Sequence, residues 1–178
     1  MENQKEKGLI HIYCGDGKGK TTAAVGLSVR AAGSGRKVLF LQFLKGQESS
    51  ELAMLGRLGI TVMRSLPDMG FTWTMDESQK KLCTEHHSRC LREAYSLAQR
   101  GEVGMLVLDE LLAAYHTGLI DRELVKKVIL EKPYDLELVM TGRDPEPFMI
   151  DAADYVSVIQ KQKHPYEKGI SARYGIEW

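Results

Sequence analysis

Ile10-His11-Ile12-Tyr13-Cys14-Gly15-Asp16-Gly17-Lys18-Gly19-Lys20-Thr21-Thr22 predicts a β-strand, a glycine-rich loop and the first turn of a helix, in that order. The β-type apolar run ends at Cys14, and the helical pattern begins at Lys20. Three glycines alternate with polar residues between these two points. A strand that leads through such a loop into a helix is typical of a site that binds phosphate groups.

The loop has the residue types that phosphate binding requires. Glycines adopt backbone angles closed to other residues, so successive N–H groups can face an anion, and the following helix adds its positive N-terminal end. Gly19-Lys20-Thr21 fits the end of the Walker A pattern, in which lysine contacts phosphoryl oxygens and threonine binds magnesium. Cys14 stands where that pattern has its first glycine, so we expect a shorter or tighter loop. The predicted phosphate-binding residues are Gly15, Asp16, Gly17, Lys18, Gly19, Lys20, Thr21 and Thr22.

Length and composition indicate one globular domain. The 178 residues suffice for one substantial core, and the hydrophobic and charged fractions of 43% and 27% are ordinary for a globular protein. We expect a single domain over residues 1–178, with 1–8 as a short flexible N-terminus. Because 24 basic residues balance 24 acidic ones, we expect no nucleic-acid partner. The lack of long apolar runs and the three sparse cysteines predict no membrane partner and a cytoplasmic location.

Strands and helices are predicted to alternate along the rest of the chain. The apolar run 38–44 has no polar alternation, which is typical of a parallel strand buried on both faces. Further strands are expected at 60–63, 104–110, 136–141 and 155–159, and helices at 20–32, 50–58, 76–100 and 121–131, the last with Asp121 as N-cap. This order predicts an α/β fold of the P-loop NTPase-like (RecA-like) type, a mostly parallel sheet flanked by helices.

A second motif lies at the end of a predicted strand. Leu106-Val107-Leu108-Asp109-Glu110 resembles a Walker B strand, whose terminal carboxylate completes a magnesium site. Magnesium bound to phosphates needs only one or two such carboxylates. Either Asp109 or Glu110 could coordinate the metal, and the spacing does not decide between them. The alternative is a strand that merely ends in acidic residues.

Two further groups of residues have both a functional and a structural interpretation. Cys83, His86, His87 and Cys90 share one face of a predicted helix, as a metal site would require, but this face is also the apolar one. We therefore favour burial in the core over metal binding. Phe71 and Trp73 lie in a predicted loop and could either fill the core or form an apolar floor for a flat ligand.

Together these motifs resemble the P-loop family of ATP:corrinoid adenosyltransferases, the cob(I)alamin adenosyltransferases. The resemblance covers nearly the whole chain and keeps the family's order, and the non-glycine residue at Cys14 also matches. The matching pieces are Gly15 to Ala24, Gln42 to Gly46, Gly70 to Trp73, Leu108 to Leu111, Thr141 to Arg143, and a tail from Lys163-His164 to Gly175-Ile176-Glu177.

The resemblance implies transfer of the 5′-deoxyadenosyl group of ATP to the cobalt(I) of a corrinoid, either cobalamin or cobinamide, with release of triphosphate. It implies that Lys20, Thr21 and Glu110 are catalytic because they stabilise charge on the leaving group. Magnesium or manganese would bind Thr21 and Glu110, with Asp109 as a further candidate ligand. Phe71 and Trp73 would contact the corrinoid and displace its axial base, and Arg30 would contact ATP.

The resemblance also implies partners: a reduced flavoprotein as electron donor and a second copy of the chain in a homodimer. Better-known members carry a longer N-terminal segment that folds over the active site, and we expect this lid to be missing or truncated here. Two other functions stay open at this point. One is a P-loop ATPase or kinase that cleaves the β–γ bond, and the other is a non-catalytic module that binds nucleotide or corrinoid.

Overall fold

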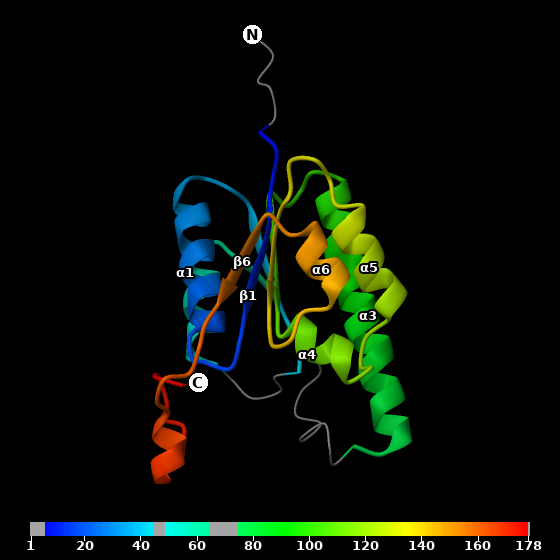
Figure 1. Cartoon of the computed structure of the whole chain (residues 1–178). Coiled ribbons are helices and arrows are strands. Elements are labelled where there is room, and N and C mark those ends of the chain that lie inside the picture. The colour runs from blue at the N-terminus through cyan, green and yellow to red at the C-terminus, as the bar shows by residue number, and fades with distance from the viewer. Residues whose placement is uncertain (1–5, 45–48, 65–74, 178) are drawn as a thin grey trace.

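The computed structural model describes residues 6–44, 49–64 and 75–177 and contains a six-stranded sheet in which all neighbouring strands are parallel (Figure 1). The strand order is β3-β2-β4-β5-β1-β6. The strands are β1 (Ile10–Cys14), β2 (Val38–Gln42), β3 (Thr61–Arg64), β4 (Met105–Asp109), β5 (Glu137–Thr141) and β6 (Tyr155–Val158). The helices are α1 (Lys20–Gly33), α2 (Ser50–Arg57), α3 (Glu77–Gln99), α4 (Leu111–His116), α5 (Arg122–Leu130), α6 (Pro147–Ala152) and the 3-10 helix η2 (Pro165–Lys168).

Helices cover both faces of the sheet. The helix α1 lies on one face in Figure 1, and α3, α4, α5 and α6 lie on the other. The core on the α1 face also includes Leu52 and Leu55 of α2, which pack with Phe40 of the sheet. On the opposite face, Leu91 of α3 and Leu111 of α4 pack with Leu106 and other strand residues. The central strands β2 and β4 are therefore buried along their whole length.

The predicted fold class is confirmed. Each predicted strand and helix is present, with ends that differ by a few residues, and Asp121 caps α5 by accepting a hydrogen bond from the Leu124 amide. Among the described residues, the structure adds three short helices that the sequence did not predict, α4, α6 and η2. Each has four to six residues, which is too short for helical periodicity to show. No helix in the described ranges is long and apolar enough to cross a membrane.

The carboxyl ends of the strands form the edge where the two motifs meet. The register pairs Gln42 at the end of β2 with Asp109 at the end of β4. It also pairs Tyr13 of β1 with Thr141 of β5, so the glycine loop begins beside the end of β5. Ligands of open parallel sheets bind outside this edge. The C-terminal segment, red in Figure 1, lies at the same end of the molecule.

Candidate active site

The glycine loop begins one residue later than in the Walker A pattern because Cys14 still belongs to the strand. Its side chain is buried in the core, and the backbone turns only at Gly15, where φ is +108°. A Cβ atom on Gly15 would overlap the carbonyl oxygen of Ile159, and one on Gly17 would lie 2.8 Å from the same atom. Both glycines are therefore required by the close approach of the chain that follows β6.

This close approach fixes the loop but uses one of its amides. The Gly17 N–H donates to the Ile159 carbonyl at 2.8 Å, and the Asp16 carboxylate accepts from the Lys161 N–H at 3.0 Å. The bond from the Lys161 backbone lowers the pKa of Asp16. The expectation that the successive amides of the loop face an anion is thus wrong for Gly17, whose N–H points to the chain after β6.

The start of α1 supplies positive charge at the carboxyl edge of the sheet. Gly19 precedes the helix with φ +123°, no described side chain caps the helix N-terminus, and its first turn contains no acidic residue. Such a helix end favours a bound anion. The Lys20 ammonium donates to the Gly17 carbonyl at 2.8 Å. Burial lowers the pKa of Lys20, the nearby Arg143 guanidinium lowers it further, and Glu110 acts in the opposite direction.

Asp109 is a fully buried carboxylate that holds four elements together at the strand edge. Its Oδ1 accepts from the hydroxyls of Thr21 at 2.9 Å and Thr141 at 2.7 Å, and its Oδ2 accepts from the Gln42 amide at 3.0 Å. The donors come from α1, β5 and β2, so the carboxylate ties the first turn of α1 to the sheet. Both Asp109 oxygens are therefore occupied by hydrogen bonds from the protein.

Glu110 lines the pocket because of an unusual backbone conformation. Its φ of +60° lies in the left-handed region, which residues other than glycine seldom adopt. The Glu110 N–H donates to the Thr141 hydroxyl at 2.9 Å, which holds this conformation. Strained backbone of this kind is concentrated at functional sites. The spacing left Asp109 and Glu110 as equal candidates, whereas the structure buries the first and places the second at the pocket.

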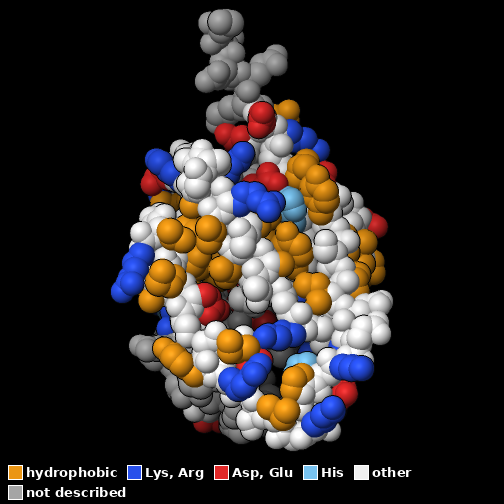
Figure 2. Space-filling model, turned by 90° about the vertical axis from the view of Figure 1, so that its left-hand side faces the viewer, with side chains coloured by type: hydrophobic (Ala, Val, Ile, Leu, Met, Phe, Trp, Pro, Cys, Tyr) orange, Lys and Arg blue, Asp and Glu red, His pale blue; other side chains and the backbone are white. Residues whose placement is uncertain are grey.

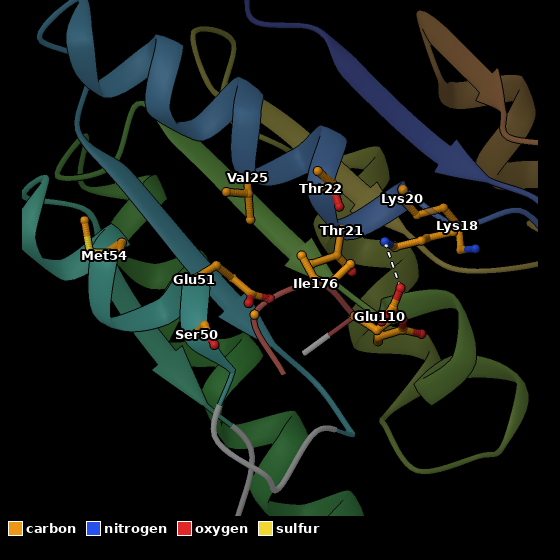
Figure 3. A pocket seen from close by; sticks show the side chains of 13 residues that line it. Lys18, Lys20, Thr21, Thr22, Val25, Ser50, Glu51, Met54, Glu110 and Ile176 are labelled. Atoms are coloured by element: carbon orange, nitrogen blue, oxygen red, sulfur yellow. Dashed lines mark hydrogen bonds and ion pairs between the residues drawn. The ribbon is translucent and has the colours of Figure 1, made fainter. Parts of the chain in front are cut away.

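The main pocket has a volume of about 650 Å³ and lies between α1, α2, the end of β4 and the C-terminal segment. Its lining residues are Lys18, Gly19, Lys20, Thr21, Thr22, Val25, Ser50, Glu51, Met54, Glu110, Gly175, Ile176 and Glu177. Figure 3 shows Lys18 and Lys20 on one side and the α2 residues on the other. The α1 face is hollowed near its lower end, among charged side chains (Figure 2). A second pocket of about 490 Å³ shares Lys20 and Glu110 and adds Arg143 and His116.

The pocket combines predicted and unpredicted residues. The structure brings Lys18, Lys20, Thr21, Thr22 and Glu110 together, as the two motifs predicted. The α2 residues Ser50, Glu51 and Met54 carried no motif, so sequence reasoning assigned them no role. The tail residues Gly175, Ile176 and Glu177 had been noted only as part of the family resemblance.

Several predicted ligand-binding residues are not among the described residues that line this pocket, including Gly15, Asp16 and Gly17 of the glycine loop. Arg30 is exposed in the last turn of α1, about 15 Å along the helix from Lys20, and lines neither pocket. Its contact with ATP stays a prediction. Phe71 and Trp73 lie outside the described residues, as do Lys45 and Gly46 of the matching pieces.

Three residues of the cysteine–histidine group on α3, Cys83, His87 and Cys90, are buried, as favoured above, and His86 is partly buried. His87 is buried, and its Nδ1 lies 2.8 Å from the Leu119 carbonyl oxygen. Burial lowers the pKa of His87 and raises the pKa of the Cys83 and Cys90 thiols. The neutral forms are therefore favoured, which suits a packed core. Within the described ranges, no group of three or more His, Cys, Asp or Glu residues could hold a metal ion.

Comparison with known proteins agrees with the geometry. Residues 6–178 match the family model of the ATP:corrinoid adenosyltransferase BtuR/CobO/CobP. The chain is 35% identical over 174 residues to a corrinoid adenosyltransferase of Pseudomonas aeruginosa, covering 97% of this chain and 85% of that protein. It is 33% identical over 181 residues to a corrinoid adenosyltransferase of Escherichia coli K12, covering 98% and 88%.

Solved structures share the fold at low sequence identity. A KaiC-like protein of Pyrococcus horikoshii superposes with a TM-score of 0.53 at 16% identity, over 89% of this chain and 75% of that chain. ATPases 2 and 3 of EssC from Geobacillus thermodenitrificans superpose with a TM-score of 0.50 at 15% identity, over 94% of this chain and 35% of that chain. These likenesses support the P-loop fold alone.

Proposed function

Because the chain belongs to the ATP:corrinoid adenosyltransferase family, it is an enzyme that transfers the adenosyl group of ATP to a corrinoid, and we propose that Lys20, Thr21 and Glu110 perform this transfer. The observation that supports these roles is that all three side chains line one pocket at the carboxyl edge of the sheet. Family membership favours this reaction over β–γ cleavage by an ATPase or kinase, and over a non-catalytic binding module.

The proposed reaction requires positioning and charge stabilisation. The electron pair of cobalt(I) forms a bond to the 5′ carbon, while the electrons of the C5′–O bond leave with the triphosphate. Negative charge therefore increases on the leaving oxygen. The Lys20 ammonium and the uncapped N-terminus of α1 stabilise that charge. No side-chain base is needed, because neither reactant loses a proton.

Magnesium, or manganese in its place, suits the oxygen atoms at this edge. The hydroxyl of Thr21 donates to Asp109 at 2.9 Å, so its oxygen is held at the strand edge, and Thr21 and Glu110 line the same pocket. The buried Oε1 of Gln42 has no hydrogen-bond partner among the described residues and could accept from a metal-bound water. Hard oxygen donors of this kind fit magnesium on a triphosphate, where the ion supplies charge neutralisation. We assign Asp109 the role of orienting Thr21, and Glu110 that of a metal ligand.

We propose that Phe71 and Trp73 contact the corrinoid, either cobalamin or cobinamide. Aromatic side chains against its lower face would displace the axial base and exclude water. Loss of that donor stabilises the empty axial orbital and makes reduction of cobalt(II) to cobalt(I) easier. Support for this assignment comes from the family resemblance of the Gly70 to Trp73 segment.

We further propose a homodimer that acts in the cytoplasm with a reduced flavoprotein as electron donor. The strand β6 supports the dimer, since Tyr155, Val156 and Val158 are exposed large hydrophobic residues on an outer strand of the described sheet. ATP and reducing equivalents are both available in the cytoplasm.

The proposed function is tested by anaerobic incubation with ATP, magnesium and chemically reduced cobalamin. We expect a light-sensitive alkylcobalamin spectrum together with one triphosphate per corrinoid. Formation of ADP and orthophosphate with unchanged cobalamin would instead show that the loop serves an ordinary ATPase or kinase.

The corrinoid assignment has its own test. Phe71→Ala or Trp73→Ala should strongly reduce turnover of cobalt(II) substrate in the presence of a reductant, while turnover of pre-reduced cobalt(I) is retained. This split is expected because the aromatic side chains assist reduction and not the transfer itself. Equal loss with both substrates would contradict the axial-base role.

A further inference from the structure

The C-terminal residues 173–177 form a compact turn beside the glycine loop (residues 15–19), which is called the phosphate loop from here on. The Ile176 and Glu177 N–H groups donate to the Arg173 carbonyl at 3.2 and 2.9 Å, and Gly175 has the positive φ of +73° that the turn needs. The Glu177 carboxylate closes the turn, since it accepts from the Arg173 N–H at 2.8 Å and from the Arg173 guanidinium at 2.9 and 3.1 Å. The position of Ile176 is thus set by hydrogen bonds on both sides of it.

The same carboxylate attaches the turn to the pocket. The Glu177 Oε1 accepts from the Lys18 ammonium of the phosphate loop at 3.3 Å. As a result Gly175, Ile176 and Glu177 line the main pocket together with the loop. Figure 3 shows Ile176 between the loop lysines and the α2 residues. A segment more than 150 residues away in sequence therefore forms one wall of the candidate nucleotide site, as the separation of 159 between Lys18 and Glu177 shows.

The pocket has a mixed lining. Lys18, Lys20, Thr21 and Thr22 line it from the glycine loop and the start of α1, and Ser50 and Glu51 line it from α2. Val25, Met54 and Ile176 add apolar surface (Figure 3). Ile176 is 57% exposed and Met54 is 51% exposed, so both present free apolar surface. A site that combines apolar walls with a few charged and polar groups suits a ligand that has both kinds of surface. ATP is such a ligand, because it joins the apolar faces of adenine to a triphosphate that suits the two lysines.

From these contacts we propose that Ile176 is a specificity-determining residue that packs against the adenine of ATP, and that Glu177 positions it through Lys18 and Arg173. This inference rests on the proposed function, because it takes ATP as the substrate of the pocket. It adds the C-terminal turn to the nucleotide site, so the pocket distinguishes ATP from a bare polyphosphate.

The test compares binding of magnesium ATP with binding of magnesium tripolyphosphate, measured by calorimetry on the full chain. Ile176→Ala should weaken ATP binding about fivefold to tenfold, the effect of losing one partly buried aliphatic contact, and should leave tripolyphosphate binding unchanged. Glu177→Gln should lower the preference for ATP over tripolyphosphate in the same direction, because Ile176 is no longer held in place. Ile170→Ala is the matched control, since Ile170 is also an exposed tail isoleucine but does not line the pocket.

Three outcomes would overturn the proposal. They are unchanged ATP binding by Ile176→Ala, an equal loss for ATP and tripolyphosphate, and an equal effect of Ile170→Ala. Adenosyl transfer by the unmodified chain is measured in parallel with reduced cobalamin. If transfer is absent the proposed function fails, whereas transfer with unchanged ATP affinity in Ile176→Ala refutes only the role of the turn.

Discussion

The two walls of the main pocket are stabilised in different ways. At the strand edge, Asp109 and Thr141 are fully buried and joined by a hydrogen bond of 2.7 Å. The other wall is the C-terminal turn 173–177, called the tail wall below. There the side chains of Lys18 and Arg173 are 48% and 59% exposed, and both pair with Glu177. Buried hydrogen bonds to a carboxylate are costly to break, whereas exposed ion pairs contribute little and are screened by salt.

This difference suggests a division of roles within the site. The strand edge holds Thr21 and Glu110, which the proposed reaction needs in fixed positions, because charge stabilisation depends on preorganised groups. The tail holds Ile176, which contacts a part of the substrate that does not react. A weakly held wall is sufficient for that contact. The predictions below test this division, beginning with the largest expected effect.

Replacement of Lys20 should have the largest effect on activity. Lys20→Ala removes the ammonium that lines both pockets beside the phosphate loop, and we expect the turnover rate to fall about 10²- to 10³-fold. The measurement is formation of alkylcobalamin from pre-reduced cobalamin at saturating ATP. Lys126→Ala, at an exposed position of α5, is the control and should be near the unmodified rate. A loss below tenfold would mean that the helix N-terminus stabilises the leaving group without the lysine.

Replacement of Thr141 should mainly reduce the stability of the folded protein. Thr141→Val keeps the shape of the side chain but leaves Asp109 with one donor fewer and the partly buried Glu110 N–H without its acceptor. We expect the free energy of unfolding to fall by about 1–3 kcal/mol, measured by chemical denaturation. Thr141→Ser should restore most of it.

A control separates this effect from the loss of any threonine hydroxyl. Thr84 donates to the Lys80 carbonyl within α3 at 2.8 Å and, at the long distance of 3.4 Å, to the Gly118 carbonyl, so Thr84→Val should cost less than about 0.5 kcal/mol. If Thr141→Val costs no more than Thr84→Val, the strand edge is not the rigid wall described above.

The strand edge could be predicted from the sequence because its signals are local and regular. A phosphate loop after one strand and two carboxylates after another place their residues at the same edge of any parallel sheet. What the sequence could not decide was the choice between Asp109 and Glu110. That choice depends on the left-handed backbone at Glu110 and on the hydroxyl of Thr141, and both follow from tertiary contacts.

The tail wall could not be predicted in the same way. Residues after Ile159 show neither strand nor helical periodicity, and the ion pair between Lys18 and Glu177 joins distant parts of the chain. The sequence also indicated only part of the reason why glycine is needed at positions 15 and 17. They were interpreted as an anion nest, while the structure shows that the carbonyl of Ile159 occupies the space of their missing side chains.

The smallest expected effect is the pH dependence of the tail wall. The Arg173 side chain, the Arg173 backbone and Lys18 lower the pKa of Glu177 from 4.5 to about 2. Because the folded pKa is depressed, the contact is fully present above about pH 4.5 and is lost only as the pH falls toward 2. Glu177 therefore stays ionised near neutral pH, and small changes of pH in that range should not alter the preference for ATP over tripolyphosphate through this residue.

The carboxyl carbon shift of Glu177, measured by NMR at about pH 4, tests this expectation. It should be that of the ionised form in the unmodified chain and should move toward the protonated form in Arg173→Ala. Added salt at about 0.5 M should cause a smaller change in the same direction, because Arg173 is more than half exposed. If Arg173→Ala leaves the shift unchanged, the arginine does not hold Glu177, and the position of Ile176 must then depend on the backbone turn alone.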